Sequence, residues 1–355
     1  MAPISICVIA KNEEKHMEIF LSSIENCFKN VPHEIVLVDT GSSDNTVLIA
    51  RKYTDKIYHF EWNDDFSAAR NFSLSHASYD WVLVLDCDEY ITHLEPEGLE
   101  DIINRYPGAV GMISRRNHFI ADGNDNIYID NVERFFNRKT FYYEATIHEQ
   151  VHAHDGYNFM RINIPLTTEH YGYYGSPDEL RPKIEHKNRL LFKELEENPD
   201  DSYLYLQIGR SFLMLQDGEK ACCYFEKALE HQLDPRAEYV QQLVIDYGYT
   251  LLSLKRYEQA LQFKNIYDKF AITADFVCLM GFIYLKNGML TEAMEEFQNA
   301  TTFRSSKLEG ANSFIPTYQM GCINEMRGDV DSAAALYKQC RDYKPAVERL
   351  RELGV

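Results

Sequence analysis

The sequence predicts an α/β domain with a mainly parallel sheet in residues 1–175, followed by an all-α helical repeat domain in residues 202–355. In the first part, short β-rich runs alternate with helical stretches, which is typical of a parallel sheet with crossover helices. From about residue 178 onward the hydrophobic spacing is helical, and β-rich runs nearly disappear. The 355 residues also exceed what one core usually holds. We therefore expect two domains, joined by a linking helix over residues 176–201.

Four β-rich runs form the expected sheet. Their hydrophobicity is continuous rather than alternating, as in strands that are buried on both faces of a parallel sheet. The expected strands are residues 4–10, 33–39, 57–60 and 81–86, and the expected helices are residues 13–27, 44–53 and 65–77. In open sheets of this kind, ligands bind outside the carboxyl ends of the strands. Polar residues directly after these strands are therefore candidates for ligand contacts.

The second half of the chain contains an internal repeat. Four glycines are each followed by an alanine twelve residues later: Gly209–Ala221, Gly248–Ala260, Gly281–Ala293 and Gly321–Ala333. Three of these pairs have an aromatic residue four positions after the alanine (Phe225, Phe297 and Tyr337), whereas the second has Lys264. These positions resemble the tetratricopeptide repeat, which stacks helix pairs into a concave surface suited to peptides or partner proteins. An ordinary helical bundle is the alternative.

The composition limits the classes of partner. The formal net charge is −19, whereas nucleic-acid-binding proteins carry an excess of Lys and Arg, so no nucleic-acid partner is expected. The apolar run at residues 4–10 is too short for a signal sequence, and no run approaches the roughly 18 apolar residues of a membrane span. The eight cysteines are scattered without a CxxC pair, which favours reduced thiols. These features predict a cytoplasmic protein without a transmembrane segment.

The stretch WVLVLDCDEY, residues 81–90, ends a buried strand in three acidic side chains, Asp86, Asp88 and Glu89. A solvated turn is the simplest explanation of an isolated DxD motif. Here, however, the motif follows the fourth strand of an α/β domain, where a ligand is expected. Two carboxylates one residue apart can hold a hard divalent cation that keeps open positions for substrate phosphates. The motif therefore predicts a cation site at this strand end.

Two further clusters lie close to the expected strands. The stretch EIVLVDTGSSDNT, residues 34–46, places Asp39 at the end of the second strand, ahead of a Gly-Ser turn. The stretch DDFSAARNFSL, residues 64–74, carries Arg70 on a helix, where a surface salt bridge is the alternative explanation. No GxGxxG motif follows the first strand, which disfavours a dinucleotide-binding fold.

Together these stretches resemble the inverting family 2 glycosyltransferases, whose GT-A fold is Rossmann-like. The matching stretches are ISICVIAKNEE, EIVLVDTGSSDNT, DDFSAARNFSL and WVLVLDCDEY, in that order, within a likeness over residues 3–175. The KNEE variant with a downstream repeat array resembles the branch that modifies peptides and proteins, including the S-glycosyltransferases of glycosylated bacteriocins. The resemblance implies a metal-dependent enzyme that uses a nucleoside-diphosphate sugar, with UDP expected, and a peptide, protein or glycan acceptor.

The resemblance also implies roles for individual residues. The end of the first strand and Asp39 would contact the nucleoside, and Arg70 would face the nucleotide. This chain has Thr40 where many relatives have a second Asp, so which of the two positions contacts the base stays open. Asp86 would lie near the ribose and the cation, and Asp88 would bind Mg²⁺ or Mn²⁺ directly. The implied nucleotide-sugar residues are Ala10, Asn12, Glu13, Asp39, Thr40, Arg70 and Asp86.

A general base and a further metal ligand complete the expected site. Glu149, in YYEATIHEQV, stands about where relatives carry their base and would take the acceptor proton during a single inverting displacement. His148 is the second catalytic candidate, and a hydrogen-bonded structural strand is the alternative for both. His170 resembles the C-terminal histidine of the metal shell, which makes Asp88, Asp86 and His170 the implied ligands. Whether His148 or His170 completes the shell stays open, with His170 favoured.

A nucleotide-binding repeat scaffold without turnover is the main alternative to a transferase. The joint presence of the DxD motif, Arg70 and Glu149 favours the transferase, because a decayed enzyme would be expected to lose at least one of them. The segment 133–145, with Arg134 and several aromatics, is interpreted either as a stacking surface for a sugar ring or as a packed strand. The motifs specify neither the donor sugar nor the acceptor.

Overall fold

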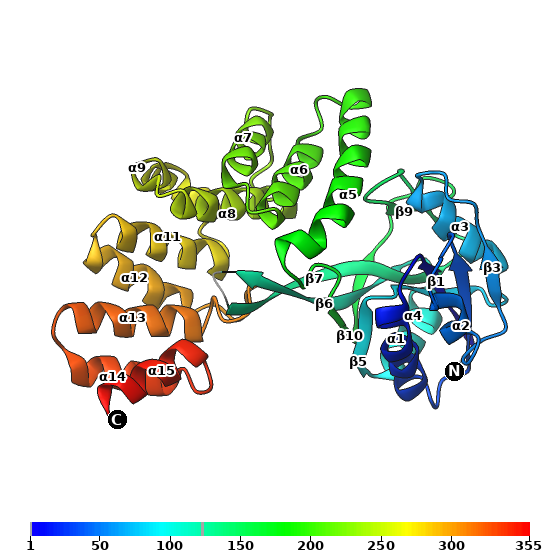
Figure 1. The fold of residues 1–355 in the computed structure, drawn as a ribbon, viewed down its shortest axis with the longest axis horizontal. Coiled ribbons are helices and arrows are strands. Elements are labelled where there is room, and N and C mark those ends of the chain that lie inside the picture. Colours follow the sequence, from blue (N-terminus) through cyan, green and yellow to red (C-terminus); the bar gives the residue numbers. More distant parts are fainter. Residues whose placement is uncertain (1, 122–123) are drawn as a thin grey trace. The chain divides into compact units, whose positions relative to one another are not determined.

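The computed structural model describes residues 2–121 and 124–355, and the chain divides into two compact units, Met1–Gly175 and Ser176–Val355. The N-terminal unit is built on an eight-stranded sheet, and the C-terminal unit consists of helices (Figure 1). The predicted order of an α/β part followed by an all-α part is confirmed. No helix within the described ranges is long and apolar enough to cross a membrane.

The sheet has the strand order β3-β2-β1-β4-β7-β6-β10-β5. Its first four strands pair in parallel, as predicted, but β7 runs antiparallel to β4 and β6, and β5 runs antiparallel to β10. The sheet is therefore mixed, because β6 and β7 follow each other without the crossover helix that parallel neighbours need. The strands are β1 Ile4–Ala10, β2 His33–Asp39, β3 Ile57–His59, β4 Trp81–Asp86, β5 Glu89–Leu94, β6 Val110–Ala121, β7 Asn124–Asn137, β8 Phe141–Glu144, β9 Gln150–Ala153 and β10 Arg161–His170.

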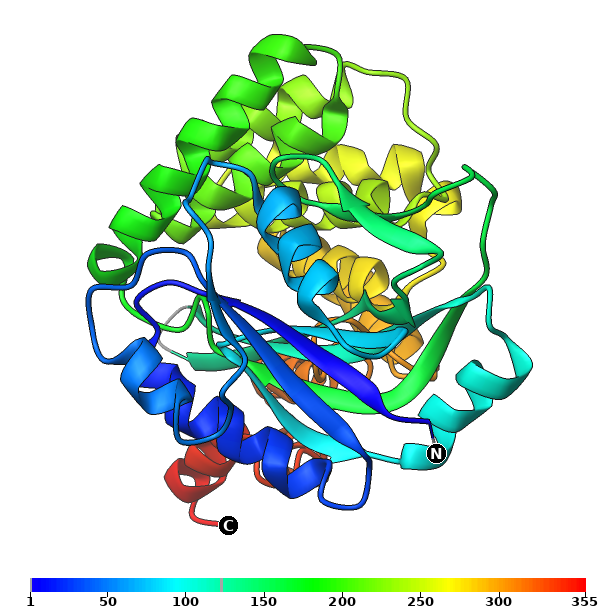
Figure 2. The same ribbon diagram turned by 90° about the vertical axis from the view of Figure 1, so that its right-hand side faces the viewer.

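Both faces of the sheet are covered. Side chains of β1 alternate between the faces, so Ile6 and Val8 pack with helices α1 and α4, whereas Cys7 packs with α3 and the small β8-β9 sheet. Figure 2 shows α3 on one side of the strands and α1 and α4 on the other. The helices of this unit are α1 Glu14–Cys27, α2 Thr46–Ala50, α3 Phe66–His76 and α4 Pro96–Arg105. This double cover explains the continuous hydrophobicity of β1, β2 and β4.

The C-terminal unit begins with the predicted long helix, α5 Pro177–Glu197. Ser176 and Glu179 form a capping box at its start, and Asn198 caps its end before Pro199. The remaining helices are α6 Ser202–Met214, α7 Gly218–Leu229, α8 Glu238–Ser253, α9 Tyr257–Ala260, the 3₁₀ helix η1 Leu261–Ile266, α10 Tyr267–Phe270, α11 Ala274–Lys286, α12 Leu290–Ala300, α13 Phe314–Met326, α14 Val330–Gln339 and α15 Lys344–Leu353. The pairs α6–α7, α8–α9, α11–α12 and α13–α14 pack in chain order, as the repeat predicts.

In three of these pairs, a glycine of the first helix lies against an aromatic ring of the second. These contacts are Gly209–Phe225, Gly281–Phe297 and Gly321–Tyr337, and a Cβ built on each glycine would lie 2.4–2.6 Å from the ring. Real Cβ atoms do not approach this closely, so only glycine allows the two helices to pack at this distance. The predicted alternation of small and aromatic residues therefore sets the spacing inside each pair.

The second pair departs from this pattern because its second helix changes winding. α9 ends at Ala260 and the chain continues as η1, in which one turn takes about 3.0 residues rather than about 3.6. The residue one turn after Ala260 is consequently Phe263 and not Lys264. Phe263 is buried, and a Cβ on Gly248 would lie 2.9 Å from its ring, while Lys264 is exposed. The aromatic that the sequence lacks at position 264 is thus supplied one position earlier.

Candidate active site

The loops after β1 and β2 are tied together at the carboxyl edge of the sheet. The backbone N–H of Asn12 donates to Ser42 Oγ at 2.9 Å, and Asn12 Oδ1 accepts from the N–H of Ser43 at 2.8 Å. The N–H of Glu13 donates to Thr46 Oγ1 at 2.7 Å. Asn12 has a φ of 56°, a left-handed conformation that Asn tolerates better than most residues. These bonds give the two loops one defined shape.

The predicted nucleoside residues lie at this edge, where Asp39 ends β2 and Thr40 follows it. Thr40 bonds Ala10 O through both its N–H, at 2.9 Å, and its hydroxyl, at 3.2 Å. Asp39 Oδ1 accepts from the N–H of Ser42 at 3.0 Å, while its Oδ2 lies 3.6 Å from Nδ1 of the largely exposed His59. The Thr40 hydroxyl is therefore used inside the fold, whereas Asp39 turns one oxygen toward an exposed neighbour.

Arg70 on α3 joins two predicted site residues that are far apart in the sequence. Its Nε donates to Glu149 Oε1 at 2.6 Å, and its Nη2 donates to Asp86 Oδ1 at 2.8 Å. The Arg70 side chain is 5% exposed, so this is a buried ion pair and not the surface salt bridge considered as the alternative. Its Nη1 is buried without a hydrogen-bond partner among the described residues. Such an orphaned donor is rare in a native fold, so Arg70 Nη1 is a candidate contact for a ligand.

Both oxygens of Asp86 are held by arginines. Oδ1 accepts from Arg70, and Oδ2 accepts from Arg134 Nη2 at 2.6 Å. Burial opposes ionisation of Asp86, but the charges of Arg134 and Arg70 outweigh it and hold the pKa of this carboxyl well below its usual range. Glu89 is fully buried, and its Oε1 accepts from Arg134 at 3.0 Å and from Arg115 at 3.1 Å. Arginines thus pair with Asp86 and Glu89, two of the three acids at the turn from β4 to β5.

The third acid, Asp88, faces His170 at the end of β10. Asp88 Oδ1 lies 3.5 Å from His170 Nε2, and both side chains are about nine-tenths buried. His170 Nδ1 donates to Asn117 Oδ1 at 2.7 Å. The Asn117 amide is itself oriented, because its Nδ2 donates to Tyr128 O at 3.0 Å and to Asp130 Oδ1 at 3.1 Å. The hydrogen bond to Asn117 therefore orients the imidazole so that Nε2 faces Asp88.

The backbone of Gly172 packs closely beside this pair. A Cβ at Gly172 would lie 2.3 Å from Asp88 Oδ2 and 2.5 Å from His170 Nε2, so only glycine fits at this position. No group of three or more His, Cys, Asp or Glu side chains with metal-ligand geometry occurs within the described ranges. Asp88 and His170 would offer a cation one carboxylate and one imidazole. Two protein ligands fit a Mg²⁺-like ion, which usually takes its other ligands from substrate phosphates and water.

His148 and Glu149 lie in the turn between β8 and β9. Two residues of this turn have left-handed backbones, Ala145 with a φ of 81° and His148 with a φ of 57°. Such conformations cost energy for residues other than glycine and are held by surrounding contacts. Here Thr146 O accepts from the N–H of Phe66 at 3.0 Å, and Glu149 is bound by Arg70. Both contacts that hold the turn, from Phe66 and from Arg70, therefore come from α3.

The segment 133–145 spans the end of β7 and all of β8, and its phenylalanines are packed in the cores rather than forming a stacking surface. Phe135, Phe136 and Phe141 are fully buried in the two cores of the unit. Arg134, from the same segment, is buried and directed to Asp86 and Glu89. Of the two interpretations that the sequence allowed, the structural one is correct for these side chains.

Several residues of the site were not predicted as such. The pairing of Arg115 with Asp130 is bidentate, at 3.0 and 2.7 Å, and it depends on the β6-β7 register, which places the two residues opposite each other. Asn117 and Arg134 also reach the site through strand pairing, which single-sequence patterns do not encode. Gly172 did carry a signal, since it lies two residues after the predicted ligand His170.

Several known proteins are similar to this chain. Residues 5–165 match the family profile described as Glycosyl transferase family 2. A TPR repeat-containing protein of Synechococcus elongatus is 29% identical over 237 residues, which are 62% of this chain and 54% of that protein. The SPbeta prophage-derived glycosyltransferase SunS of Bacillus subtilis is 23% identical over 242 residues, 67% of this chain and 56% of SunS. The chain thus spans about half the length of these curated relatives.

Two other likenesses are shorter or weaker. The lipopolysaccharide core biosynthesis glycosyltransferase LpsC of Rhizobium meliloti is 28% identical over 127 residues, 34% of this chain and 45% of LpsC. The crystal structure of MamA covers 50% of this chain and 96% of its own with a TM-score of 0.39 and 17% identity, which is too distant to bear on function. The profile match therefore identifies a glycosyltransferase family 2 domain over residues 5–165, and a unit of helices follows this domain.

Proposed function

We propose that the N-terminal unit transfers a sugar, with inversion, from a nucleoside-diphosphate sugar to a peptide, protein or glycan acceptor, with UDP as the nucleotide and Mg²⁺ or Mn²⁺ as the cation. The observation that carries the proposal is the facing pair of Asp88 and His170 beside Gly172. Asp88 lies two residues after β4 and His170 ends β10, at the carboxyl edge where ligands bind in α/β sheets. The glycosyltransferase names of two relatives support the reaction class.

Asp88 and His170 would hold the cation. A carboxylate oxygen and an imidazole nitrogen 3.5 Å apart need either a shared proton or a shared cation between them. The hydrogen bond to Asn117 orients the ring so that Nε2 faces Asp88 Oδ1, and we propose that a cation lies between them. When bound, the cation would neutralise charge on the departing nucleoside diphosphate. Asp86 would join this shell only by exchanging an arginine, so we assign it to positioning Arg70 and to the ribose side of the donor.

The nucleotide would be held by the two tied loops and by Arg70. Asp39 offers one carboxylate oxygen at this edge, while the Thr40 hydroxyl is engaged by Ala10. This difference favours Asp39 over Thr40 as the contact to the base or ribose. Arg70 Nη1, which is buried without a partner among the described residues, would donate to an oxygen of the nucleotide. Ala10, Asn12 and Glu13 would contribute their backbone to the same edge of the sheet.

Glu149 would act as the general base. Arg70 binds its Oε1, and no hydrogen bond of its Oε2 is found among the described residues, so Oε2 can accept a proton. In the transfer, the acceptor heteroatom bonds to the anomeric carbon, the bond from that carbon to the diphosphate oxygen breaks, and the acceptor proton moves to Glu149. Arg70 would fix the base relative to Asp86. His148, in the same strained turn, would bind a phosphate of the donor or the cation.

The first test separates cation binding from folding. Calorimetric titration with UDP should show tight binding only when Mn²⁺ is present, and Asp88→Asn should remove that dependence and lower affinity by at least about tenfold. Asp80→Asn is the matched control, because Asp80 precedes β4 and pairs with the exposed Lys139. Unchanged Mn²⁺-dependent binding in the Asp88 variant would remove Asp88 from the cation.

The second test addresses turnover. A panel of sugar nucleotides should reveal donor hydrolysis by the wild-type protein, and Glu149→Gln should bind UDP normally but slow sugar release by about 10²–10⁴-fold. Glu144→Gln is the control, since Glu144 lies on the same β8-β9 hairpin and is exposed. Near-normal turnover in the Glu149 variant would refute the base assignment. UDP binding without sugar release from any donor would favour the nucleotide-binding scaffold instead.

A further inference from the structure

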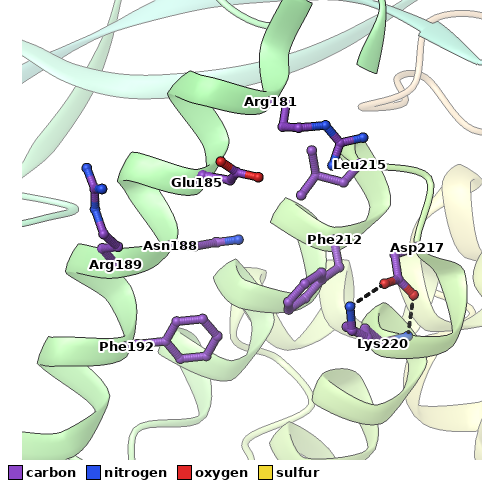
Figure 3. Close-up of a pocket in the computed structure, with 9 residues that line it drawn as sticks. All are labelled: Arg181, Glu185, Asn188, Arg189, Phe192, Phe212, Leu215, Asp217 and Lys220. Atoms are coloured by element: carbon purple, nitrogen blue, oxygen red, sulfur yellow. Dashed lines mark hydrogen bonds and ion pairs between the residues drawn. The ribbon is translucent and has the colours of Figure 1, made fainter. Parts of the chain in front are cut away.

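The helical unit contains a groove of about 480 Å³ between α5 and the α6–α7 pair. This volume falls in the range of roughly 300–1,000 Å³ that small-ligand sites occupy. The lining residues are Arg181, Glu185, Asn188, Arg189 and Phe192 of α5, followed by Phe212, Leu215, Asp217 and Lys220 (Figure 3). All of them belong to one compact unit, so the groove is a property of that unit alone.

Asn188 is the unusual residue of the groove. Its side chain points from α5 toward Phe212 (Figure 3), yet the residue is only 7% exposed. Its Oδ1 is buried, and no hydrogen-bond partner is found for it among the described residues. The neighbouring buried positions of α5, Ile184 and Leu191, are apolar. A leucine at position 188 would satisfy both helix propensity and packing, so a lone buried amide here calls for a ligand.

The walls of the groove combine aromatic and cationic groups. Phe212 is fixed by stacking on Tyr224, with ring centroids 5.5 Å apart, and by Lys220 Nζ, 5.2 Å from its centroid. Arg189 donates to His186 Nδ1 at 2.9 Å and has no carboxylate partner among the described residues. Arg181 pairs at 3.6 Å with Asp178, whose side chain is 94% exposed. The rim thus presents guanidinium groups that are weakly engaged.

We propose that this groove binds an extended peptide segment that carries an acidic side chain. A side-chain amide offers one acceptor and two donors, which match the N–H and C=O of an extended backbone, whereas a helical peptide uses these groups internally. Phe192, Phe212 and Leu215 provide apolar contact for a side chain of the peptide, and Arg189 would pair with its carboxylate. Peptide binding is argued from the groove itself. Only the identification of this peptide as part of the acceptor rests on the proposed function.

The charges of the groove favour a single carboxylate over a phosphate-rich ligand. Glu185 and Asp217 also line it, and Asp217 already pairs with Lys220 at 2.8 Å. A polyanion would meet these two acids as well as the cations. One carboxylate on a peptide needs only one guanidinium and can avoid them. In a chain with a net charge of −19, this cationic rim also gives an acidic segment a place where it is not repelled.

The test uses the full chain and fluorescein-labelled heptapeptides of Ala and Gly with one Phe and one Asp, the Asp standing one to four positions after the Phe. At least one member should bind measurably, and methylation of its backbone nitrogens should weaken binding. Asn188→Leu should lower affinity by about tenfold or more without lowering the thermal midpoint of unfolding. The proposal fails if no member binds below millimolar concentrations, or if Asn188→Leu binds as the wild type does.

A second variant keeps the proposal testable if Asn188→Leu perturbs the fold. Arg189 is exposed, so Arg189→Ala should fold normally and lose the preference for the Asp peptide over its Asn analogue. Lys193→Ala is the control, because Lys193 is exposed on the same helix but does not line the groove. An unchanged preference in Arg189→Ala would overturn the charge pairing. Full displacement of the peptide by inorganic phosphate at similar concentration would show an anion site and overturn the peptide assignment.

Failure of this inference can be told apart from failure of the proposed transferase function. UDP and Mn²⁺ should bind Asn188→Leu as they bind the wild type, and the peptide should bind Asp88→Asn as it binds the wild type. Loss of peptide binding in Asp88→Asn would contradict a groove that works within the helical unit alone. Peptide binding in the absence of any donor turnover would leave the groove standing and sink the transferase.

Discussion

The two units of this protein place their decisive contacts at very different separations along the chain. In the helical unit, the aromatic that packs on each glycine follows it by 16 residues, from 209 to 225, 281 to 297 and 321 to 337. In the N-terminal unit, Arg70 reaches Glu149 across 79 residues, and Arg134 reaches Asp86 across 48. The first kind of contact is steric and repeats; the second is ionic and occurs once. The repeated steric contacts can therefore be predicted from residue spacing in the sequence, whereas the single ionic contacts cannot.

The largest expected effect comes from removing a buried arginine side chain from the N-terminal unit. Arg134→Met would leave the fully buried Glu89 and the paired Asp86 without one of their cations, which costs about 3–5 kcal/mol when one partner of a buried pair is lost. Both tryptophans, Trp62 and Trp81, lie in this unit, so their fluorescence follows its unfolding in urea. We expect an earlier fluorescence transition, with little change in the helical signal of the other unit.

The control for this prediction is Arg105→Met. Arg105 is an exposed residue of α4 that pairs with Asp101 one helical turn away, and such surface pairs contribute about 0–1 kcal/mol. Equal urea midpoints for the Arg134 and Arg105 variants would show that the ionic network does not hold the unit together. In that case the two units would differ in the sequence separation of their contacts, but the ionic contacts would not contribute to stability.

The next effect tests whether the second repeat follows the same steric rule with a shifted register. Phe263→Ala removes a buried ring that packs on Gly248 and should destabilise the helical unit by about 3 kcal/mol. Lys264→Ala, at the position where an α-helical register would place the ring, should change stability by less than about 0.5 kcal/mol. Far-UV circular dichroism during urea unfolding measures both. Similar losses for the two variants would contradict the 3₁₀ register.

The sequence predicted the repeat well because every requirement was local. Small residues, aromatics and helix ends stand at fixed spacings, and even the exception at Lys264 was visible as a missing ring. Its cause was not visible, because a change from α to 3₁₀ winding depends on how η1 packs against α11. The first four strands were also predictable from local features, because their continuous apolar runs predicted parallel pairing. Strands β5 to β10 carry no such local marker of their order in the sheet.

The candidate site was predicted only in its acidic and strand-end parts. Asp88, Asp39 and Arg70 stand beside recognisable strand ends or motifs. Arg134 and Arg115 have no motif, and they reach Asp86 and Glu89 only because β7 pairs with β4 and β6. Two of the three acids that suggested a cation are instead neutralised by these arginines. Charge balance at a buried site is therefore a tertiary property, and composition alone gave no indication that cations gather there.

The smallest expected effect compares two glycines that obey the same rule against different neighbours. Gly281→Ala places a Cβ 2.6 Å from two ring atoms of Phe297, and a fully buried ring has little room to move. Overpacking of this kind costs about 1–3 kcal/mol, while replacing a helical glycine by alanine gains about 1 kcal/mol in helix propensity. The first term is larger, so the helical unit should lose about 1 kcal/mol.

At Gly248 the two terms nearly cancel. The closest atom to a new Cβ is Leu279 Cδ2 at 2.5 Å, the tip of a side chain that can change rotamer, and the ring of Phe263 lies farther away at 2.9 Å. Gly248→Ala should therefore change the urea midpoint of the helical signal little, whereas Gly281→Ala should lower it. The opposite order would mean that Phe297 yields more easily than Leu279. In that case the rigidity of the aromatic ring would not explain why the α-helical pairs of the repeat have an aromatic residue at this position.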